Sequence, residues 1–244
     1  MWFISPSLLR EYLFCPRSFF YRRLQHYSLI SFTNGNIVAQ ERIDAFTSGF
    51  FSTLNKWNEK TSLRTLFDLE YLLSSKFSTH LKYENQAIRE LYEKVFTLLL
   101  WLIVHLWKKR TPNDEIPYYL PLMVNEFIQA PGIHLQGRPS AVFRQPNESA
   151  LILIQTFHQK FLQIHSFQPA IYARILQTKG INAQDYLFVN YHRMDFKFQH
   201  LKQSDFDSLD IFLKDFANTL REGNFDPPKN PPCELCEFKW ICQD

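Results

Sequence analysis

Three of the four cysteines lie within the last dozen residues, and their spacing is typical of a metal site. Cys233, Cys236 and Cys242 form a Cys-x2-Cys-x5-Cys pattern, whereas Cys15 lies near the opposite end of the chain. Four thiolates in a tetrahedral arrangement hold zinc or an iron–sulfur cluster, and a Cys-x2-Cys turn lets two sulfurs face one centre. We therefore predict that all four cysteines bind one inorganic centre, which would join the first helix to the last turn.

Two other uses of the cysteines compete with ligation. Free cysteines are small hydrophobic residues that often lie unligated in a core. Disulfides are the less favoured alternative, because the sequence shows no signal peptide and a chain of 244 residues does not need a disulfide framework. We accordingly expect a reducing, cytoplasmic location.

Composition indicates a packed globular protein of one domain spanning residues 1–244. A hydrophobic content of 45% and an aromatic content of 16% argue against disorder. The net charge of +3 is compatible with a nucleic-acid partner without requiring one. The longest apolar run, Val95 to Trp107, is too short to span a bilayer, so we expect no membrane contact.

The elements that must position these residues follow from periodicity. Ser5-Pro6-Ser7 is a helix start, with a capping hydroxyl and a proline in the first turn. Further helices are predicted at about 37–51, 63–77, 83–109, 167–177 and 206–221. Strands are predicted at 118–129, 133–137, 141–144, 150–157 and 186–191. Because Leu151 to Ile154 is continuously apolar, that strand should be buried on both faces of the sheet. The order predicts an α/β fold with a helical insertion near the N-terminus.

Three motifs together resemble a known family. The first runs from Ser7 through Cys15-Pro16-Arg17, the second is Gln168-Pro169-Ala170-Ile171-Tyr172 (a QxxxY motif), and the third is the closing cysteine triplet. In this order they resemble the RecB-like PD-(D/E)XK nucleases that carry an iron–sulfur cluster, such as the CRISPR-associated RecB-like exonucleases and the nuclease domain of AddB.

The resemblance implies a fold and a cofactor. The fold would be a restriction-endonuclease-like core, a mixed central sheet flanked by helices, with a helical insertion at about 52–115 and a cluster-binding tail at 227–244. A structural four-iron four-sulfur cluster (4Fe-4S) on Cys15, Cys233, Cys236 and Cys242 would join the two ends of the chain. Zinc is the alternative, because four thiolates suit either metal.

The catalytic positions of the family are replaced in this sequence. Such nucleases hydrolyse phosphodiesters with magnesium or manganese held by carboxylates, assisted by a lysine. By resemblance, the early histidine position holds Ala39, the aspartate position Ser140, the acidic position of the next strand Leu153 and the lysine position Gln155. Glu126 matches a family glutamate and is the one remnant. Without these charges we expect no magnesium site and no catalysis.

DNA binding is the function that the remaining residues favour. By resemblance, Gln168 and Tyr172 lie near the bound strand, and Arg17, Arg22 and Arg23 supply cations for phosphates. We expect an inactive nuclease-like protein that serves as a DNA-binding or scaffolding module, with other subunits of a repair, recombination or defence complex as partners.

Two alternatives remain open from the sequence. The first is an active, magnesium- or manganese-dependent DNA exonuclease whose ligands have migrated, with Glu148, His158 and Asp195 as substitutes near the sheet. The second is a zinc-stapled protein-interaction domain without a nucleic-acid role.

Overall fold

The structure is a computed structural model of the chain. It describes residues 2–24, 42, 45–54, 66–81, 86–108, 118–119, 129–130, 133–137, 139–144, 149–156, 167–191, 193, 195–229, 233, 236, 238 and 242.

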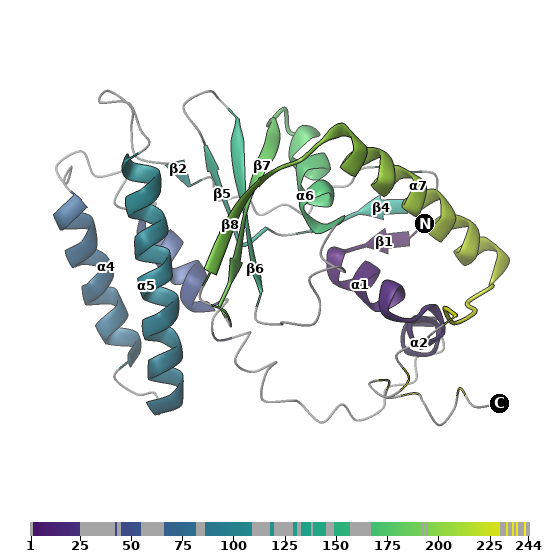
Figure 1. Cartoon of the computed structure of the whole chain (residues 1–244), viewed down its shortest axis with the longest axis horizontal. Coiled ribbons are helices and arrows are strands. Elements are labelled where there is room, and N and C mark those ends of the chain that lie inside the picture. Colours follow the sequence, from purple (N-terminus) through teal and green to yellow (C-terminus); the bar gives the residue numbers. More distant parts are fainter. Residues whose placement is uncertain are drawn as a thin grey trace.

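A five-stranded mixed sheet stands at the centre of the molecule, in the order β2-β5-β6-β7-β8 (Figure 1). Its strands are β2 (Tyr118–Tyr119), β5 (Ala141–Arg144), β6 (Ala150–Thr156), β7 (Ala183–Asn190) and β8 (Asp195–His200). Strands β6 and β7 run parallel and are connected through helix α6 (Phe167–Gln177), whereas the other neighbouring pairs are antiparallel. The predicted mixed α/β architecture is confirmed.

A second, three-stranded sheet lies beside the first, in the order β1-β4-β3. Its strands are β1 (Trp2–Ile4), β3 (Gln129–Ala130) and β4 (Ile133–Leu135). The sequence analysis does not predict β1, because three residues are too few to show a period. It pairs in parallel with β4, from far along the chain.

Two hydrophobic clusters cover the two faces of the central sheet, so β6 is buried on both sides as predicted. Ile152 and Ile154 point into a cluster with α6, and we call this side the α6 face. Leu151 and Leu153 point into a cluster with α5, and we call this side the α5 face. The alternation follows from the two-residue period of a strand.

The helices divide between these two faces (Figure 1). The α6 face carries α1 (Pro6–Phe14), α2 (Pro16–Phe19), α6 and α7 (Gln203–Glu222). The α5 face carries a helical stretch at residues 45–54, α4 (Leu66–Leu81) and α5 (Gln86–Lys108). Among the described residues, no helix combines the length and apolar character needed to cross a membrane.

The N-terminal helix begins as its sequence predicts. The Ser5 hydroxyl accepts a hydrogen bond from the backbone N–H of Leu8 at 3.2 Å, and Pro6 occupies the first turn. Cys15 separates α1 from α2 in an extended conformation, and a π-helical turn, η1 (Phe20–Leu24), follows α2.

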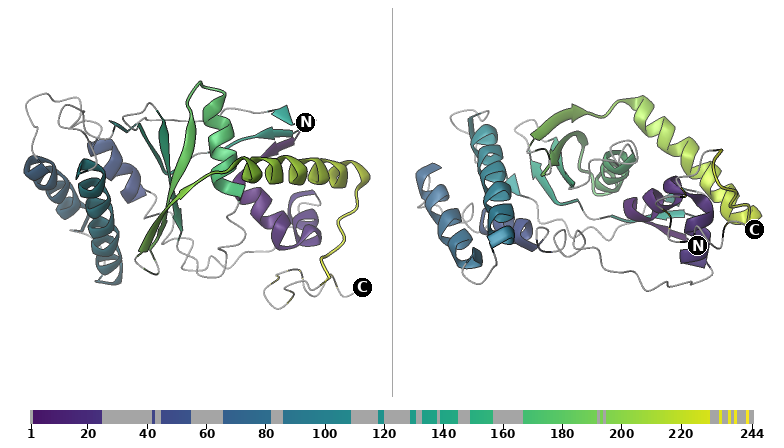
Figure 2. Two further views of the ribbon diagram at one scale, coloured as in Figure 1. Left: turned by 45° about the horizontal axis from the view of Figure 1, so that its top comes forward. Right: turned by 60° about the horizontal axis from the view of Figure 1, so that its bottom comes forward.

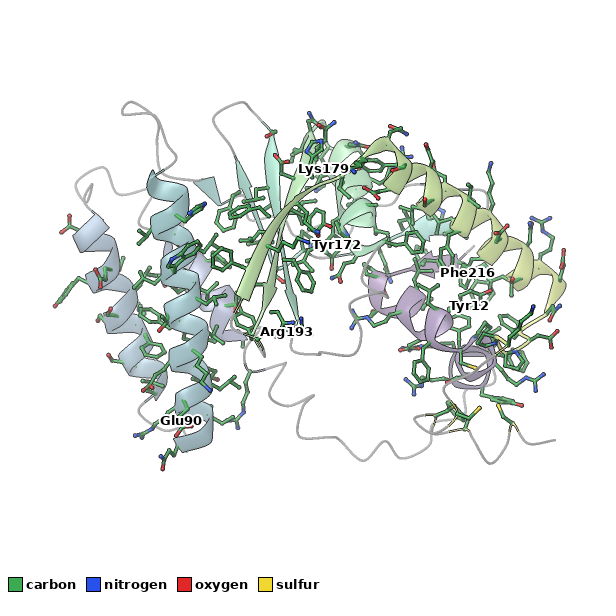
Figure 3. All side chains as sticks on the ribbon, viewed as in Figure 1. Tyr12, Glu90, Tyr172, Lys179, Arg193 and Phe216 are labelled. Carbon is green, nitrogen blue, oxygen red and sulfur yellow. The ribbon has the colours of Figure 1, made fainter. Side chains whose placement is uncertain are left out.

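Helix α7 holds these N-terminal helices against the rest of the protein (Figure 2). Its fully buried Phe216 lies 4.5 Å from the ring of Tyr12, and the two side chains point toward one another (Figure 3). The Tyr12 hydroxyl also donates to the Thr219 hydroxyl at 3.2 Å. The helix ends at Gly223, whose φ of 72° is the left-handed conformation that glycine tolerates, as predicted.

The sequence analysis does not predict one strand of the central sheet. Strand β8 pairs with β7 and forms an edge of the sheet, with Phe196 and Phe198 alternating with polar residues. Strand β7 also begins three residues earlier than predicted, at Ala183. Most of the strand predicted at 118–129 and part of the helix predicted at 37–51 lie outside the described residues.

Candidate functional site

The two positions that the sequence analysis matches by resemblance to catalytic carboxylates, Ser140 and Leu153, lie at the start of β5 and on the neighbouring strand β6. Ser140 forms a bend immediately before β5, and the next residue, Ala141, pairs with Leu153 of β6. Gln155 follows two residues later on β6, where its backbone pairs with Val189. Sheet register therefore brings the aspartate and acidic positions next to each other.

Leu153 is fully buried on the α5 face of the sheet. It has 0% exposure and belongs to a cluster that includes Phe143 and Leu187 from the adjacent strands. Ser140, in contrast, is partly exposed at the sheet end. The acidic position is thus part of the hydrophobic core and offers no charge or polar atom to a metal ion.

Other predicted positions lie outside the described residues. These are Ala39 and Glu126, together with the side chains of Gln155 and Asp195 and the substitutes Glu148 and His158. Within the described part of the chain, no group of three or more His, Cys, Asp or Glu residues could hold a metal ion.

The QxxxY motif lies on the other side of the sheet. Gln168 and Tyr172 are one helical turn apart on α6, and the Gln168 side-chain amide donates to the Tyr172 hydroxyl at 3.1 Å. Tyr172 packs into the cluster on the α6 face (Figure 3). The structure therefore does not bring the motif onto the face that holds Leu153.

Gly137 allows the segment before β5 to approach Tyr172 closely. A methyl group on Gly137 would lie 2.6 Å from Cε1 and 3.0 Å from Cδ1 of the Tyr172 ring. A contact this short does not occur between real side chains, so only glycine fits here without displacing the tyrosine. The close approach also places the segment that leads to Ser140 beside α6.

Arg10 is a residue near this site that the sequence analysis misses. It is half-buried on α1, which packs against α6. Burial lowers the pKa of Arg10, and electrostatic interactions with Tyr172 and Glu11 act in the opposite direction. The signal in the sequence is a single basic residue of the first helix, which follows Leu8 and Leu9 and precedes Glu11.

The three predicted arginines are engaged with carboxylates in the free protein. Arg23 donates two hydrogen bonds to Glu11, at 2.6 and 2.8 Å, and these raise the pKa of Arg23. Arg22 lies 3.7 Å from the same carboxylate, and Arg17 lies 3.4 Å from Asp226. All three ion pairs are partly exposed, so a phosphate could exchange with the carboxylate at modest cost.

Figure 3 shows sulfur atoms close together below α2. Cys15, Cys233 and Cys236 each lie near enough to Cys242 to affect its thiol electrostatically. Cys15 is buried, with an exposure of 4%. The other three lie in turns, where the N–H of Cys236 donates to the carbonyl of Cys233 at 3.2 Å and that of Cys242 donates to Phe238 at 3.1 Å.

The other three cysteines affect the pKa of the Cys242 thiol. Burial raises the pKa of the Cys242 thiol, and Cys236, Cys15 and Cys233 raise it further, while Arg17 opposes them. None of the four forms a disulfide in the described structure. The kind and number of donors suit a four-thiolate centre. Within the described residues, however, the four sulfur atoms are not arranged as a group that could hold a metal ion.

The sequence model of the PD-(D/E)XK nuclease superfamily matches residues 4–243, which is nearly the whole chain. This chain belongs to the PD-(D/E)XK nuclease superfamily. No curated protein matches the chain.

Two solved structures resemble this superfamily member. A crystal structure of a protein named SSO0001 is 16% identical, with a TM-score of 0.40, covering 99% of this chain and 85% of the other. A crystal structure of a protein from Eubacterium rectale, described as a candidate exonuclease, is 11% identical with a TM-score of 0.49, covering 99% of this chain and 88% of the other.

Nucleases of this superfamily carry their metal ligands on the central strands, so the side chains at these strands bear on catalysis. Phosphodiester hydrolysis by hard metal ions requires oxygen ligands with negative charge. Ser140 supplies only a hydroxyl group, and Leu153 supplies only hydrocarbon.

Proposed function

We propose that this PD-(D/E)XK superfamily member binds DNA without hydrolysing it, as a DNA-binding or scaffolding module of a repair, recombination or defence complex. The observation that carries the proposal is the complete burial of Leu153 in a hydrophobic cluster at the acidic position. A superfamily nuclease needs a solvated carboxylate there to hold its metal ion.

DNA contacts would come from the residues on the α6 side of the molecule. Gln168 and Tyr172 form a hydrogen-bonded pair on α6, and Arg17, Arg22 and Arg23 lie on the N-terminal helical segment that packs on the same face. Phosphate oxygens would replace the carboxylates of Glu11 and Asp226 as partners of the arginines. Such binding releases counterions and weakens steeply as salt is added.

The decisive experiment measures binding and cleavage on one sample. Fluorescence anisotropy with labelled single-stranded DNA, in the presence of manganese, should show salt-sensitive binding, and gels of the same reactions should show intact DNA. Manganese-dependent digestion that is abolished by Glu126→Gln would establish the active exonuclease instead. Absence of binding even at low salt would rule the proposal out.

We also propose that Cys15, Cys233, Cys236 and Cys242 hold a 4Fe-4S cluster whose role is structural. The supporting observations are that the four free thiols come from both ends of the chain and that Cys15, Cys233 and Cys236 all raise the pKa of Cys242. When bound, the cluster would supply a rigid four-point link between α2 and the tail. Metal analysis of anaerobically purified protein separates the cases: iron and sulfide with visible colour support the cluster, whereas zinc in colourless protein supports the zinc alternative.

A further inference from the structure

Strand β8 forms one edge of the central sheet and lies beside α5 (Figure 1). Its residues, Asp195–His200, pair with β7 on one side, and no described strand pairs with the other side. The backbone N–H and C=O groups on the outer side of an edge strand are a template on which another extended chain can pair. The outer side of β8 is thus a place where a further strand can be added to the sheet.

Aromatic side chains of α5 and β8 line this edge on the α5 face, and we call them the aromatic row. The ring centroids lie 3.9 Å apart for Phe196 and Trp101, 4.9 Å apart for Trp101 and His105, and 5.3 Å apart for His105 and Phe198. Trp101 is 44% exposed and Phe198 is 37% exposed. Because large apolar side chains that stay exposed in a contiguous group mark interaction sites, the row is a candidate docking surface.

The opposite face of β8 carries positive charge. Lys197 is exposed, and its cross-strand neighbour on β7 is Phe188, which packs against the cluster on the α6 face. The segment 193–202 has a net charge of +2, from three basic residues against one acidic residue with histidine neutral. On β7, the carboxylate of Asp185 is engaged with His200 at 2.8 Å. The edge therefore offers an apolar surface on one face and a cation on the other.

A partner polypeptide fits this edge better than a nucleic acid or a second copy of the chain. Trp101 is stacked on His105 with an interplanar angle of 13° and also lies against Phe196, so its ring faces are used within the row instead of lying open to a base. The alternating donors and acceptors of an edge strand match another peptide backbone. A second copy would bring basic side chains together, whereas an acidic strand brings opposite charges together.

We propose that β8 binds an extended segment of a partner protein, which adds a strand to the central sheet and carries alternating apolar and acidic side chains. Every second side chain of that segment packs on Trp101 and Phe198, and the acidic side chains between them face Lys197. The inference rests on the scaffolding part of the proposed function and names the chemistry of the partner. It does not depend on the DNA contacts of the α6 side.

The test uses the full-length protein and two fluorescent synthetic peptides of about six residues, a typical strand length. One peptide alternates valine with glutamate, and the other alternates valine with lysine. Anisotropy measures their binding to the wild type, to Lys197→Glu, to Trp101→Ala and to a matched control, Tyr71→Ala. Tyr71 is 73% exposed on α4, outside the aromatic row.

The glutamate peptide should bind the wild type about fivefold more tightly than the lysine peptide, the ratio expected for one opposed charge pair across two strands. Lys197→Glu should reverse this preference, and added salt should reduce it. Trp101→Ala should weaken binding of the glutamate peptide about tenfold, because an aromatic contact is lost. Tyr71→Ala should change the affinity less than about twofold.

Methylated peptides test whether the segment binds as a strand. Successive backbone N–H groups of a strand point to opposite sides, so only one of the two alternate sets in the glutamate peptide faces β8. Methylation of that set should abolish binding, and methylation of the other set should leave it unchanged. Loss of binding with neither set or with both would contradict the addition of a strand.

Equal affinity for the glutamate and lysine peptides, no binding of either, or a preference that Lys197→Glu leaves unchanged overturns the inference. Because Lys197 is exposed, this variant decides the question even if Trp101→Ala unfolds. A dimer of the free wild type that Trp101→Ala dissociates assigns the edge to a second copy, and single-stranded DNA binding that Trp101→Ala abolishes assigns it to nucleic acid; either result also overturns the inference. Failure of the wild type to bind DNA, with the peptide preference intact, overturns the DNA-binding proposal and leaves this inference standing.

Discussion

Single residues decide whether the central strands can hold a metal ion. Leu153 is enclosed on the α5 face by hydrophobic side chains of its own sheet and of the helices that cover it. Ser140, one strand away, remains partly exposed. The two positions that we matched by resemblance to the carboxylates of a superfamily nuclease therefore lie in very different environments.

Leu153→Asp should destabilise the protein strongly instead of restoring a nuclease. A carboxylate at a position of 0% exposure would lie in hydrocarbon without a partner, at a cost of at least about 3 kcal/mol. Ser140→Asp is the matched control and should remain within about 1 kcal/mol of the wild type. Urea unfolding measures both variants, and a folded Leu153→Asp with the wild-type midpoint would show that the acidic position is open to water.

Gly137→Ala should lower stability by about 1–3 kcal/mol, because the added methyl group overlaps the Tyr172 ring. The measurement is urea unfolding of Gly137→Ala in the wild type and in a Tyr172→Ala background. In that background the penalty should largely vanish, since the two side chains contact directly. An equal penalty in both backgrounds would place the strain in the backbone of Gly137.

At the scale of elements, α7 attaches the N-terminal helices to the sheet. Its inner face packs on α1 and α2 through Phe216 and on α6 through Phe206, while its outer face carries charged residues and the exposed Ile211. Phe216 is central to this contact, with Tyr12 and Phe19 packed edge-on against its ring. Aromatic pairs in this geometry add stability beyond the area that they bury.

Phe216→Ala should cost about 3–5 kcal/mol, the range for removing a fully buried aromatic ring. Ile211→Ala, on the same helix but 62% exposed, should stay within about 0.5 kcal/mol of the wild type. Chemical denaturation of both variants checks the pair. Similar losses for the two would contradict the assignment of the inner and outer faces of α7.

At the scale of the whole molecule, the two ends of the chain meet. The ion pair of Arg17 with Asp226 joins residues 209 positions apart, and Cys15 interacts electrostatically with Cys242. A metal centre at this place would close almost the entire chain into one loop. Its loss would therefore affect the whole fold and not only the tail.

With the proposed metal centre in place, a chelator should lower the unfolding temperature of the wild type, because metal binding and folding are coupled. Each 1 kcal/mol lost corresponds to roughly 2–4 °C in a domain of this size. Cys15→Ser should start at the lower temperature and show no further decrease with chelator. Calorimetry of the four samples is the measurement. A chelator effect in Cys15→Ser as large as in the wild type would exclude Cys15 from the ligands.

Much of the local structure could be predicted from the sequence. The start of α1 at Ser5, the end of α7 at Gly223 and the double burial of β6 all depend on nearby residue types and their period. Strand β1 escapes prediction because its pairing with β4 joins segments that lie far apart in the chain. The absence of a carboxylate at Ser140 and Leu153, the positions matched by resemblance, can likewise be read from the sequence.

Only the tertiary structure decides how these pieces combine. A two-residue period places Leu153 and Ile154 on opposite faces of β6, but the helices that cover each face are set by long-range packing. For the same reason, the sequence does not distinguish Arg10 from Arg23. Whether an arginine is paired or left without a carboxylate depends on which side chains the fold brings within a few ångströms of it.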